Sequence, residues 1–116
     1  MKILIVDDLK RRKQQLKEAI EKQHQVTDIS LTNEFMTIVE NETFDMIVLD
    51  METWKKGKSV YNYFKIGKKL ENIPIILYNA EEDTYFIPDR VRHEKDRILS
   101  KPVDVETVID TVQQTI

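Results

Sequence analysis

The sequence predicts a doubly wound α/β domain, in which a five-stranded parallel sheet carries helices on both faces. Residues 46–50, Met-Ile-Val-Leu-Asp, form an apolar run that ends in a carboxylate. Uninterrupted apolar runs of this length are typical of strands buried on both faces of a parallel sheet. Amphipathic segments separate this run from others like it, and connections of that length require parallel strands.

The composition predicts one globular domain covering residues 1–116. The chain is 41% hydrophobic and has only two glycines and three prolines, so it is not a linker-rich sequence. Its net charge of -3 gives no reason to expect nucleic acid as a partner. No apolar run approaches the roughly 20 residues of a membrane span, and the absence of cysteine is consistent with a reducing compartment. We therefore expect a soluble, cytoplasmic protein.

The first strand is predicted over residues 2–6 and ends in Asp7 and Asp8. Asp8 is also a candidate N-cap for the helix that follows. We expect residues 10–13, all lysine or arginine, to be exposed on this helix. Four cations in a first turn oppose the helix dipole at a cost of a few tenths of a kcal/mol each, which nearby carboxylates would offset. The expected apolar face consists of Leu9, Leu16, Ala19 and Ile20.

In the middle of the chain, the sequence pattern predicts a weak strand over residues 25–30 and a second helix capped by Thr32. The apolar side of that helix would consist of Phe35, Met36, Ile38 and Val39. The strand at 46–50 follows. A polar loop is expected at 51–56, and then a helix from about residue 57 to residue 70.

In the last part of the chain, the sequence pattern predicts a strand at 75–78, a short helix that begins near Pro88, and a fifth strand at 97–100. The final helix, from about Asp104, shows the clearest periodicity. Its apolar positions are Val105, Val108, Ile109, Val112 and Ile116.

Polar residues follow four of the predicted strands. Asp7 and Asp8 follow the first, Asp50 ends the third, Asn79 follows the fourth and Lys101 follows the fifth. In a doubly wound sheet these ends open on one edge, so we expect the five side chains to share a crevice. A lone Asp after a strand is usually a helix cap and a Lys-Pro pair is usually a turn, so the combination carries the inference.

These residue types predict phosphoryl chemistry. Three carboxylates held close together repel one another, and a divalent metal relieves the repulsion. Oxygen-only ligands favour Mg²⁺. Asp50 would attack phosphorus while the metal and Lys101 neutralise charge on the transferring oxygens, and Asn79 offers an amide donor to the same oxygens.

The same residues resemble the receiver domain of two-component response regulators. The resemblance runs the whole length of the chain and includes Lys101-Pro102 and the Ile-Pro-Ile-Ile sequence at 73–76. It implies a flavodoxin-like strand order of 2-1-3-4-5 and a signalling domain that catalyses only its own phosphorylation and dephosphorylation.

The resemblance also implies roles for individual residues. Asp50 would be the phosphoacceptor, loaded by a histidine kinase or a phosphotransfer protein. Asp8 and Asp50 would bind Mg²⁺ together with the backbone carbonyl of Glu52, and Asp7 would act largely through water. Lys101 would pair with the phosphoryl group.

Phosphorylation of such a domain implies a conformational switch. The new charge would draw in Asn79 and the loop after it, and change the face built from the fourth helix, fifth strand and fifth helix. The partner on that face would be an attached effector domain, a second copy of the chain or another protein.

Several positions depart from the family pattern. Asn79 stands where receivers have Thr or Ser, and Ile98 stands where they have an aromatic residue that turns inward on activation. We expect Tyr78 to pack in the core rather than to substitute for that aromatic residue. The loop after Asp50 lacks the usual proline, and Gly57 lies seven residues on instead of eight.

Three further residues lie where they would modify the switch. Trp54, in the loop after Asp50, would be either an anchor for a partner or a local lid. Glu52 and Glu81 fall where receivers adjust the loss of their phosphoryl group, and their charge would alter the lifetime of the phosphorylated form.

The departures leave an alternative open, a receiver-like module that binds a protein partner without phosphorylation. A hydrolase or a flavin-binding protein on the same architecture fits less well. Flavin binding needs a hydroxyl-rich loop after the first strand, where this chain has Asp-Asp-Leu-Lys-Arg-Arg. Phosphatases with an aspartyl nucleophile place it there in an Asp-x-Asp setting, which is absent.

Overall fold

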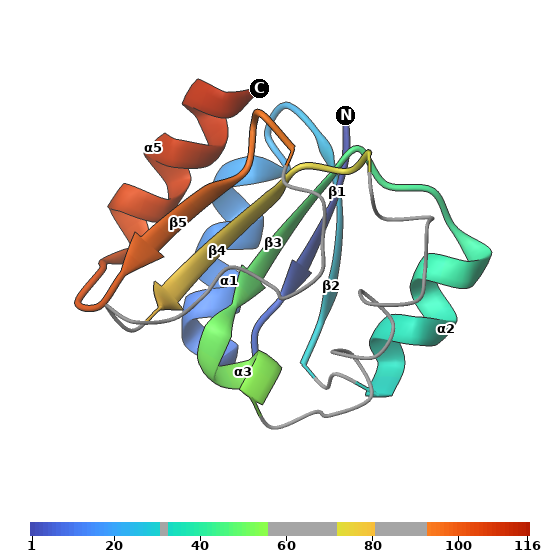
Figure 1. Ribbon diagram of the computed structural model, residues 1–116, viewed down its shortest axis with the longest axis horizontal. Helices are drawn as coiled ribbons and strands as arrows, with labels where there is room; N and C mark the ends of the chain where they lie inside the picture. Colours follow the sequence, from blue (N-terminus) through green and yellow to red (C-terminus); the bar gives the residue numbers. More distant parts are fainter. Residues whose placement is uncertain (31–32, 56–71, 81–92) are drawn as a thin grey trace.

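The computed structural model describes residues 1–30, 33–55, 72–80 and 93–116, and they contain a five-stranded parallel sheet. The strand order is β2-β1-β3-β4-β5 (Figure 1), as the family resemblance implies. The strands are β1 (Lys2–Val6), β2 (Gln25–Ile29), β3 (Met46–Asp50), β4 (Ile75–Ala80) and β5 (Arg97–Ser100). The helices among the described residues are α1 (Lys10–Ile20), α2 (Asn33–Asn41), α3 (Met51–Lys55) and α5 (Val105–Thr115).

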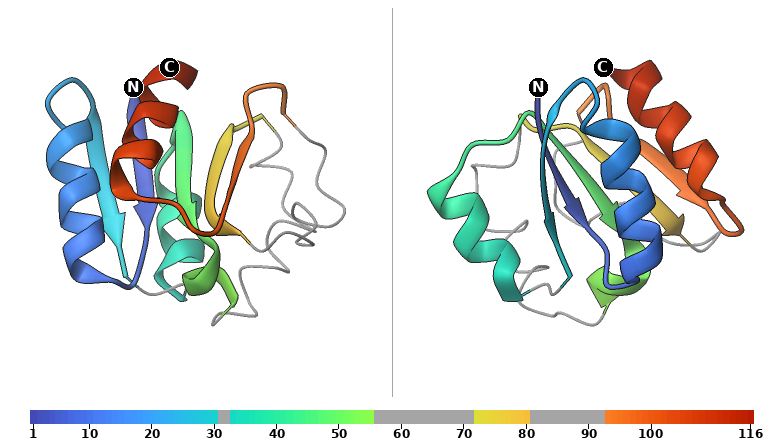
Figure 2. Two further views of the ribbon diagram at one scale, coloured as in Figure 1. Left: turned by 90° about the vertical axis from the view of Figure 1, so that its left-hand side faces the viewer. Right: turned by 180° about the vertical axis from the view of Figure 1, so that it is seen from behind.

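The sheet separates two apolar clusters, because successive side chains of a strand point to opposite faces. On β1, Leu4 and Val6 belong to the cluster beneath α2, whereas Ile3 and Ile5 belong to the cluster beneath α1 and α5. Figure 2 shows α1 and α5 side by side on one face of the sheet. All five residues of β3 are buried, which agrees with the prediction of a strand covered on both faces.

The short helix α3 corrects the prediction of a polar loop after Asp50. Residues 51–55 continue directly from β3 into one helical turn, and Met51 and Thr53 are buried. The reason is local: the backbone N–H and the hydroxyl of Thr53 both bond the carboxylate of Asp50, as an acid at a helix start does. Strand β4 also runs two residues further than predicted, through Asn79 and Ala80.

Two helix boundaries differ from their predictions. The N-cap of α1 is Leu9, without a side-chain cap bond, so Asp8 is not the cap, and Leu9 is 53% exposed instead of lying on the apolar face. The neighbouring acid, Asp7, bonds the backbone at this point instead, because its Oδ1 accepts the N–H of Leu9 at 2.9 Å. At the other end of the chain, Ile116 lies beyond the last turn of α5 and is 40% exposed.

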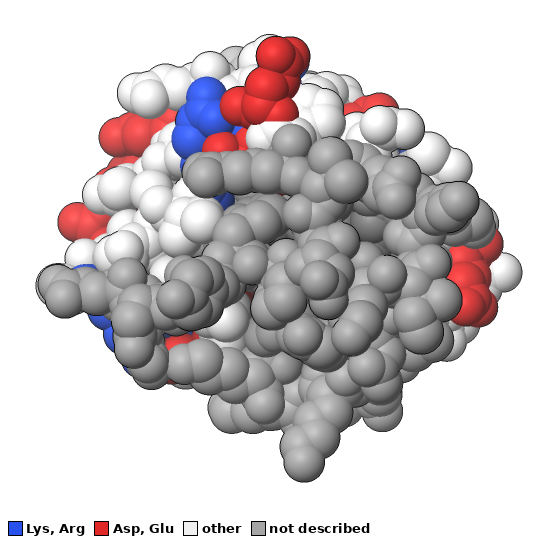
Figure 3. All heavy atoms as spheres, in the orientation of Figure 1, with Lys and Arg blue, Asp and Glu red and all other residues white. Residues whose placement is uncertain are grey.

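The last helix confirms its predicted start. The side chain of Asp104 accepts the N–H of Thr107 at 2.8 Å, and Val108, Ile109 and Val112 are buried. Of the described helices, none has the length and apolar character needed to cross a membrane. In Figure 3, acidic side chains of the described residues lie beside basic ones.

Several predictions lie outside the described residues. They are the cap at Thr32, the helix expected from about 57 to 70, Gly57, Glu81 and the short helix near Pro88. The side chains of Met36 and Trp54 belong to the same group.

Candidate functional site

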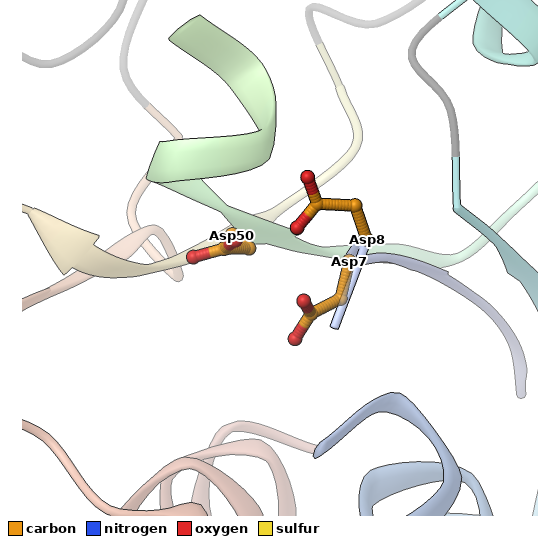
Figure 4. Close-up of side chains that lie close together, drawn as sticks. All are labelled: Asp7, Asp8 and Asp50. Atoms are coloured by element: carbon orange, nitrogen blue, oxygen red, sulfur yellow. The ribbon is translucent and has the colours of Figure 1, made fainter. Parts of the chain in front are cut away.

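The three predicted acids meet at the carboxyl edge of the sheet. One carboxylate oxygen from each of Asp7, Asp8 and Asp50 lies within 4.8 Å of the others. Asp7 and Asp50 are fully buried. Figure 4 shows Asp8 turned toward α3 and Asp7 turned toward the face of α1 and α5, with Asp50 beside them at the end of β3.

Asp7 is held by four hydrogen bonds. Its Oδ1 accepts from the N–H of Leu9 and from Nη2 of Arg12, the latter at 2.8 Å. Its Oδ2 accepts from Nε of Arg12 at 2.5 Å and from the hydroxyl of Tyr78 at 2.6 Å. A buried carboxylate needs such partners, since a buried charge without them costs several kcal/mol.

Asp50 is surrounded by donors from three elements. Its Oδ1 accepts the side-chain amide of Asn79 at 3.0 Å. Its Oδ2 accepts the hydroxyl of Thr53 at 2.7 Å and its N–H at 3.2 Å, and forms an ion pair with Nη2 of Arg12 at 3.0 Å. Thr53 also links the acids, because its hydroxyl oxygen accepts the backbone N–H of Asp8 at 3.0 Å.

Asn79 reaches Asp50 from an unusual backbone conformation. Its φ is 58°, in the left-handed region that asparagine tolerates and β-branched residues avoid. The pairing of β4 with β5 shifts register between Leu77 and Ala80, as at a bulge that redirects a side chain. This backbone provides a physical reason for asparagine at a position where the resemblance implies Thr or Ser.

Lys101 lies at the same edge of the sheet, as predicted, and its backbone N–H bonds the carbonyl of Ala80 at 2.7 Å. Its amine forms an ion pair with the carboxylate of Glu52, and both side chains are more than 40% exposed. Exposed pairs of this kind contribute about 0–1 kcal/mol, so this contact holds Lys101 only weakly.

Three residues of the site were missed by the sequence analysis. Arg12 was expected in solvent, but its side chain is 19% exposed and contacts both Asp7 and Asp50. Tyr78 packs in the core as predicted, and its hydroxyl also bonds Asp7. Thr53 lies in the segment expected to be a loop. Two signals in the sequence could have indicated these contacts. Arg12 lies among four consecutive cations in a helical turn that contains no acid, and Tyr78 is the one phenol in an otherwise aliphatic strand.

Hydrogen bonding and burial raise the pKa of two of these groups. Hydrogen bonding to Asp7 raises the pKa of Arg12 further above its usual value, against the opposing effect of burial, so the guanidinium stays charged. Burial raises the pKa of Tyr78 well above its usual value, and the nearby charge of Asp7 adds to this. Tyr78 is therefore a neutral hydrogen-bond donor at physiological pH.

The donor set fits a hard divalent cation. Its side-chain ligand atoms are carboxylate oxygens, the type that Mg²⁺ prefers. The three acids have a formal charge of about -3 when ionised, of which Arg12 balances one, leaving a charge that a divalent ion would match. Asp8 and Asp50 are the better candidate ligands, because both oxygens of Asp7 are already bonded to Arg12.

Comparison with known families gives a match over nearly the whole chain. Residues 3–113 match the family described as response regulator receiver domain. No curated protein matches the sequence.

Solved structures share the fold at low sequence identity. The chemotaxis response regulator CheY4 of Vibrio cholerae matches with a TM-score of 0.73 and 19% identity, over 99% of this chain and 98% of that one. A receiver-modulated diguanylate cyclase from Pelobacter carbinolicus matches with a TM-score of 0.71 and 21% identity, over 98% and 90%. A signal receiver domain of two-component signal transduction (histidine kinase) from Clostridium thermocellum matches with a TM-score of 0.72 and 16% identity, over 98% of this chain and 95% of that one.

Proposed function

The chain belongs to the response regulator receiver family, and from this premise we propose that Asp50 accepts a phosphoryl group in a Mg²⁺-dependent reaction. The single observation that carries the proposal is the environment of Asp50. This carboxylate is buried at the end of β3, within 4.8 Å of two further acids, and bonded by donors from α1, α3 and β4.

The chemistry is an in-line displacement at phosphorus. An oxygen of Asp50 forms the new P–O bond, and the bond from phosphorus to the donor breaks with its electron pair remaining on the donor. Mg²⁺, held by Asp8 and Asp50 with the backbone carbonyl of Glu52, would neutralise charge on the transferring oxygens. Asp7 would act through water, since Arg12 and Tyr78 occupy its oxygens.

Hydrogen-bond donors of the protein would bind the negative charge of the new phosphoryl group. The amide of Asn79 and the hydroxyl of Thr53 already point at the oxygens of Asp50 and would turn to the phosphoryl oxygens. Lys101 would leave Glu52 for the phosphoryl group, and the weakness of the exposed pair makes this exchange inexpensive. Glu52, and Glu81 after β4, would influence the lifetime of the phosphorylated form.

The partners follow from this reaction. A histidine kinase or phosphotransfer protein would supply the phosphoryl group in the cytoplasm, and an effector domain, another protein or a second copy of the chain would read the result. The reading surface would include β5 and α5 together with the predicted fourth helix. The receiver-modulated diguanylate cyclase from Pelobacter carbinolicus illustrates such an output in another protein.

The test is incubation with Mg²⁺ and a small phosphodonor, followed by intact-mass measurement. We expect a gain of one phosphoryl group that is absent in Asp50→Asn and present in Asp110→Asn, an exposed acid on α5 that serves as the matched control. Beryllofluoride binding, followed by tryptophan fluorescence, gives a second readout. No mass gain in the wild type, or the same gain in Asp50→Asn, would refute the proposal.

A second candidate is a receiver-like module that binds its partner without phosphorylation. The observations in its favour are the aliphatic Ile98, which packs against the cluster beneath α2, and the guanidinium of Arg12 among the acids. Partner binding that is equal for wild type, Asp50→Asn and phosphodonor-treated protein would support this alternative.

A further inference from the structure

Arg12 is a cation already present in the acid cluster. Its guanidinium spans both oxygens of Asp7, at 2.5 and 2.8 Å, and its Nη2 lies 3.0 Å from Oδ2 of Asp50. The ring of Tyr78 lies 5.5 Å from the guanidinium carbon, within the range of a cation–π contact. One arginine of α1 therefore bridges the ends of β1 and β3.

The contacts of Arg12 with the two acids differ in strength. Asp7 receives a two-pronged fork, the geometry in which arginine binds carboxylates best. Asp50 receives a single nitrogen, on an oxygen that also accepts two hydrogen bonds from Thr53. A carboxylate oxygen offers about two lone pairs, so the three donors on Oδ2 of Asp50 already compete for them.

A metal ion on Asp50 would lie close to this guanidinium. Mg²⁺ binds carboxylate oxygen at about 2.1 Å, and Nη2 of Arg12 is 3.0 Å from Oδ2 of Asp50. If the metal took that oxygen, the two cations would be no more than about 5 Å apart. Like charges at this separation disfavour each other's binding, and the effect is stronger at a buried carboxylate than in water.

We propose that Arg12 and a divalent metal ion compete for Asp50, so that Arg12 sets the metal affinity of the acid cluster. When metal binds, Nη2 of Arg12 gives up Asp50 while the fork on Asp7 remains. The side chain of Arg12 is 19% exposed, which leaves the guanidinium a route to move. This inference rests on the proposed metal site at Asp8 and Asp50.

The test is a titration with Mg²⁺ alone, measured by isothermal titration calorimetry at constant ionic strength. Arg12→Gln removes the charge and keeps an amide donor for Asp7. Arg11→Gln removes the same charge from the neighbouring residue, which is exposed, and is the matched control. We expect Mg²⁺ to bind Arg12→Gln at least tenfold more tightly than Arg11→Gln, and Mg²⁺ to raise its Tm by a larger amount.

Equal or weaker Mg²⁺ binding in Arg12→Gln than in Arg11→Gln would overturn the inference, and so would no binding by either. If Arg12→Gln fails to fold, Arg12→Lys replaces it. Lysine keeps the charge but cannot form the fork and the contact with Asp50 together, so we expect several-fold tighter Mg²⁺ binding than in the wild type. Unchanged or weaker binding in Arg12→Lys would overturn the inference in that case.

The titration contains no phosphodonor, so its result is separate from phosphorylation of Asp50. A protein that binds Mg²⁺ in the predicted order but gains no phosphoryl group would retain this inference and lose the proposed function. If the protein is phosphorylated on Asp50, yet Mg²⁺ binds the Arg12 and Arg11 variants equally, the proposed function is retained and this inference is lost.

Discussion

Removing the hydroxyl of Tyr78 tests the buried network beneath the acids. Tyr78→Phe keeps the ring of a residue with no exposed surface and deletes the 2.6 Å hydrogen bond to Oδ2 of Asp7. Hydrogen bonds to charged groups contribute about 1.5–3 kcal/mol. Asp7 keeps its bonds to Arg12 and Leu9, so a larger penalty for an unpaired buried charge does not apply.

We therefore expect Tyr78→Phe to lower the free energy of unfolding at pH 7 by about 2 kcal/mol. For a domain of this size the corresponding fall in Tm is roughly 6–12 °C. Urea denaturation followed by circular dichroism measures the free energy of unfolding. An unchanged m-value would show that the two proteins expose the same amount of surface when they unfold.

The effect of this substitution also depends on pH. Burial raises the pKa of Tyr78 in the folded protein well above its value in the unfolded chain, which is about 10. Above pH 10 the unfolded chain releases the phenol proton while the folded protein keeps it, so the stability contributed by Tyr78 is complete below pH 10 and falls as pH rises. The slope is about 1.4 kcal/mol per pH unit.

The difference in stability between wild type and Tyr78→Phe should consequently shrink between about pH 10 and pH 11. Lysines and the remaining tyrosines titrate in both proteins, so the difference isolates this one phenol. A difference below about 0.5 kcal/mol at pH 7, or one that stays constant up to pH 11, would refute the assignment of Tyr78 as a buried donor to Asp7.

Two further predictions concern side chains at helix N-termini, the hydroxyl of Thr53 in α3 and the carboxylate of Asp104 at the start of α5. Thr53→Val should lower the free energy of unfolding by about 1–3 kcal/mol in urea denaturation, because it leaves the N–H of Asp8 and the Oδ2 of Asp50 without the hydroxyl. Thr53→Ser is the matched control, and an equal loss in both variants would contradict the role of the hydroxyl. Asp104→Ala should lower the Tm at neutral pH, since hydrogen bonds from Thr107 lower the pKa of Asp104. That contribution is present above the ordinary aspartate pKa of about 3.9 and is lost as pH falls below it, so a Tm difference unchanged at about pH 2 would argue against the cap.

Strands β1, β3 and β4 were predictable because each contains a short apolar run between polar segments. Met46–Asp50 and Arg97–Ser100 match their predicted bounds, and the strand order follows from the family resemblance. The meeting of Asp7, Asp8 and Asp50 was predictable as well, because parallel strands bring their carboxyl ends to one edge.

The contacts of Arg12 were not predictable in the same way. Helical periodicity tells which face of α1 meets the sheet, and Leu16 and Ile20 confirm it. It does not tell how far a long side chain at the start of that helix extends over the sheet edge. The helical turn at Met51–Lys55 was missed for a related reason, since its start depends on the contact of Thr53 with Asp50 more than on an apolar pattern.

The cations at the start of α1 also bear on how the chain folds. Without Asp7 and Asp50 for Arg12, and Asp28 for Lys13, positive charge at the N-terminus of an 11-residue helix opposes helix formation. As an isolated peptide this segment would be mostly unstructured. In the folding reaction α1 would therefore consolidate after β1, β2 and β3 have paired and brought their carboxylates together.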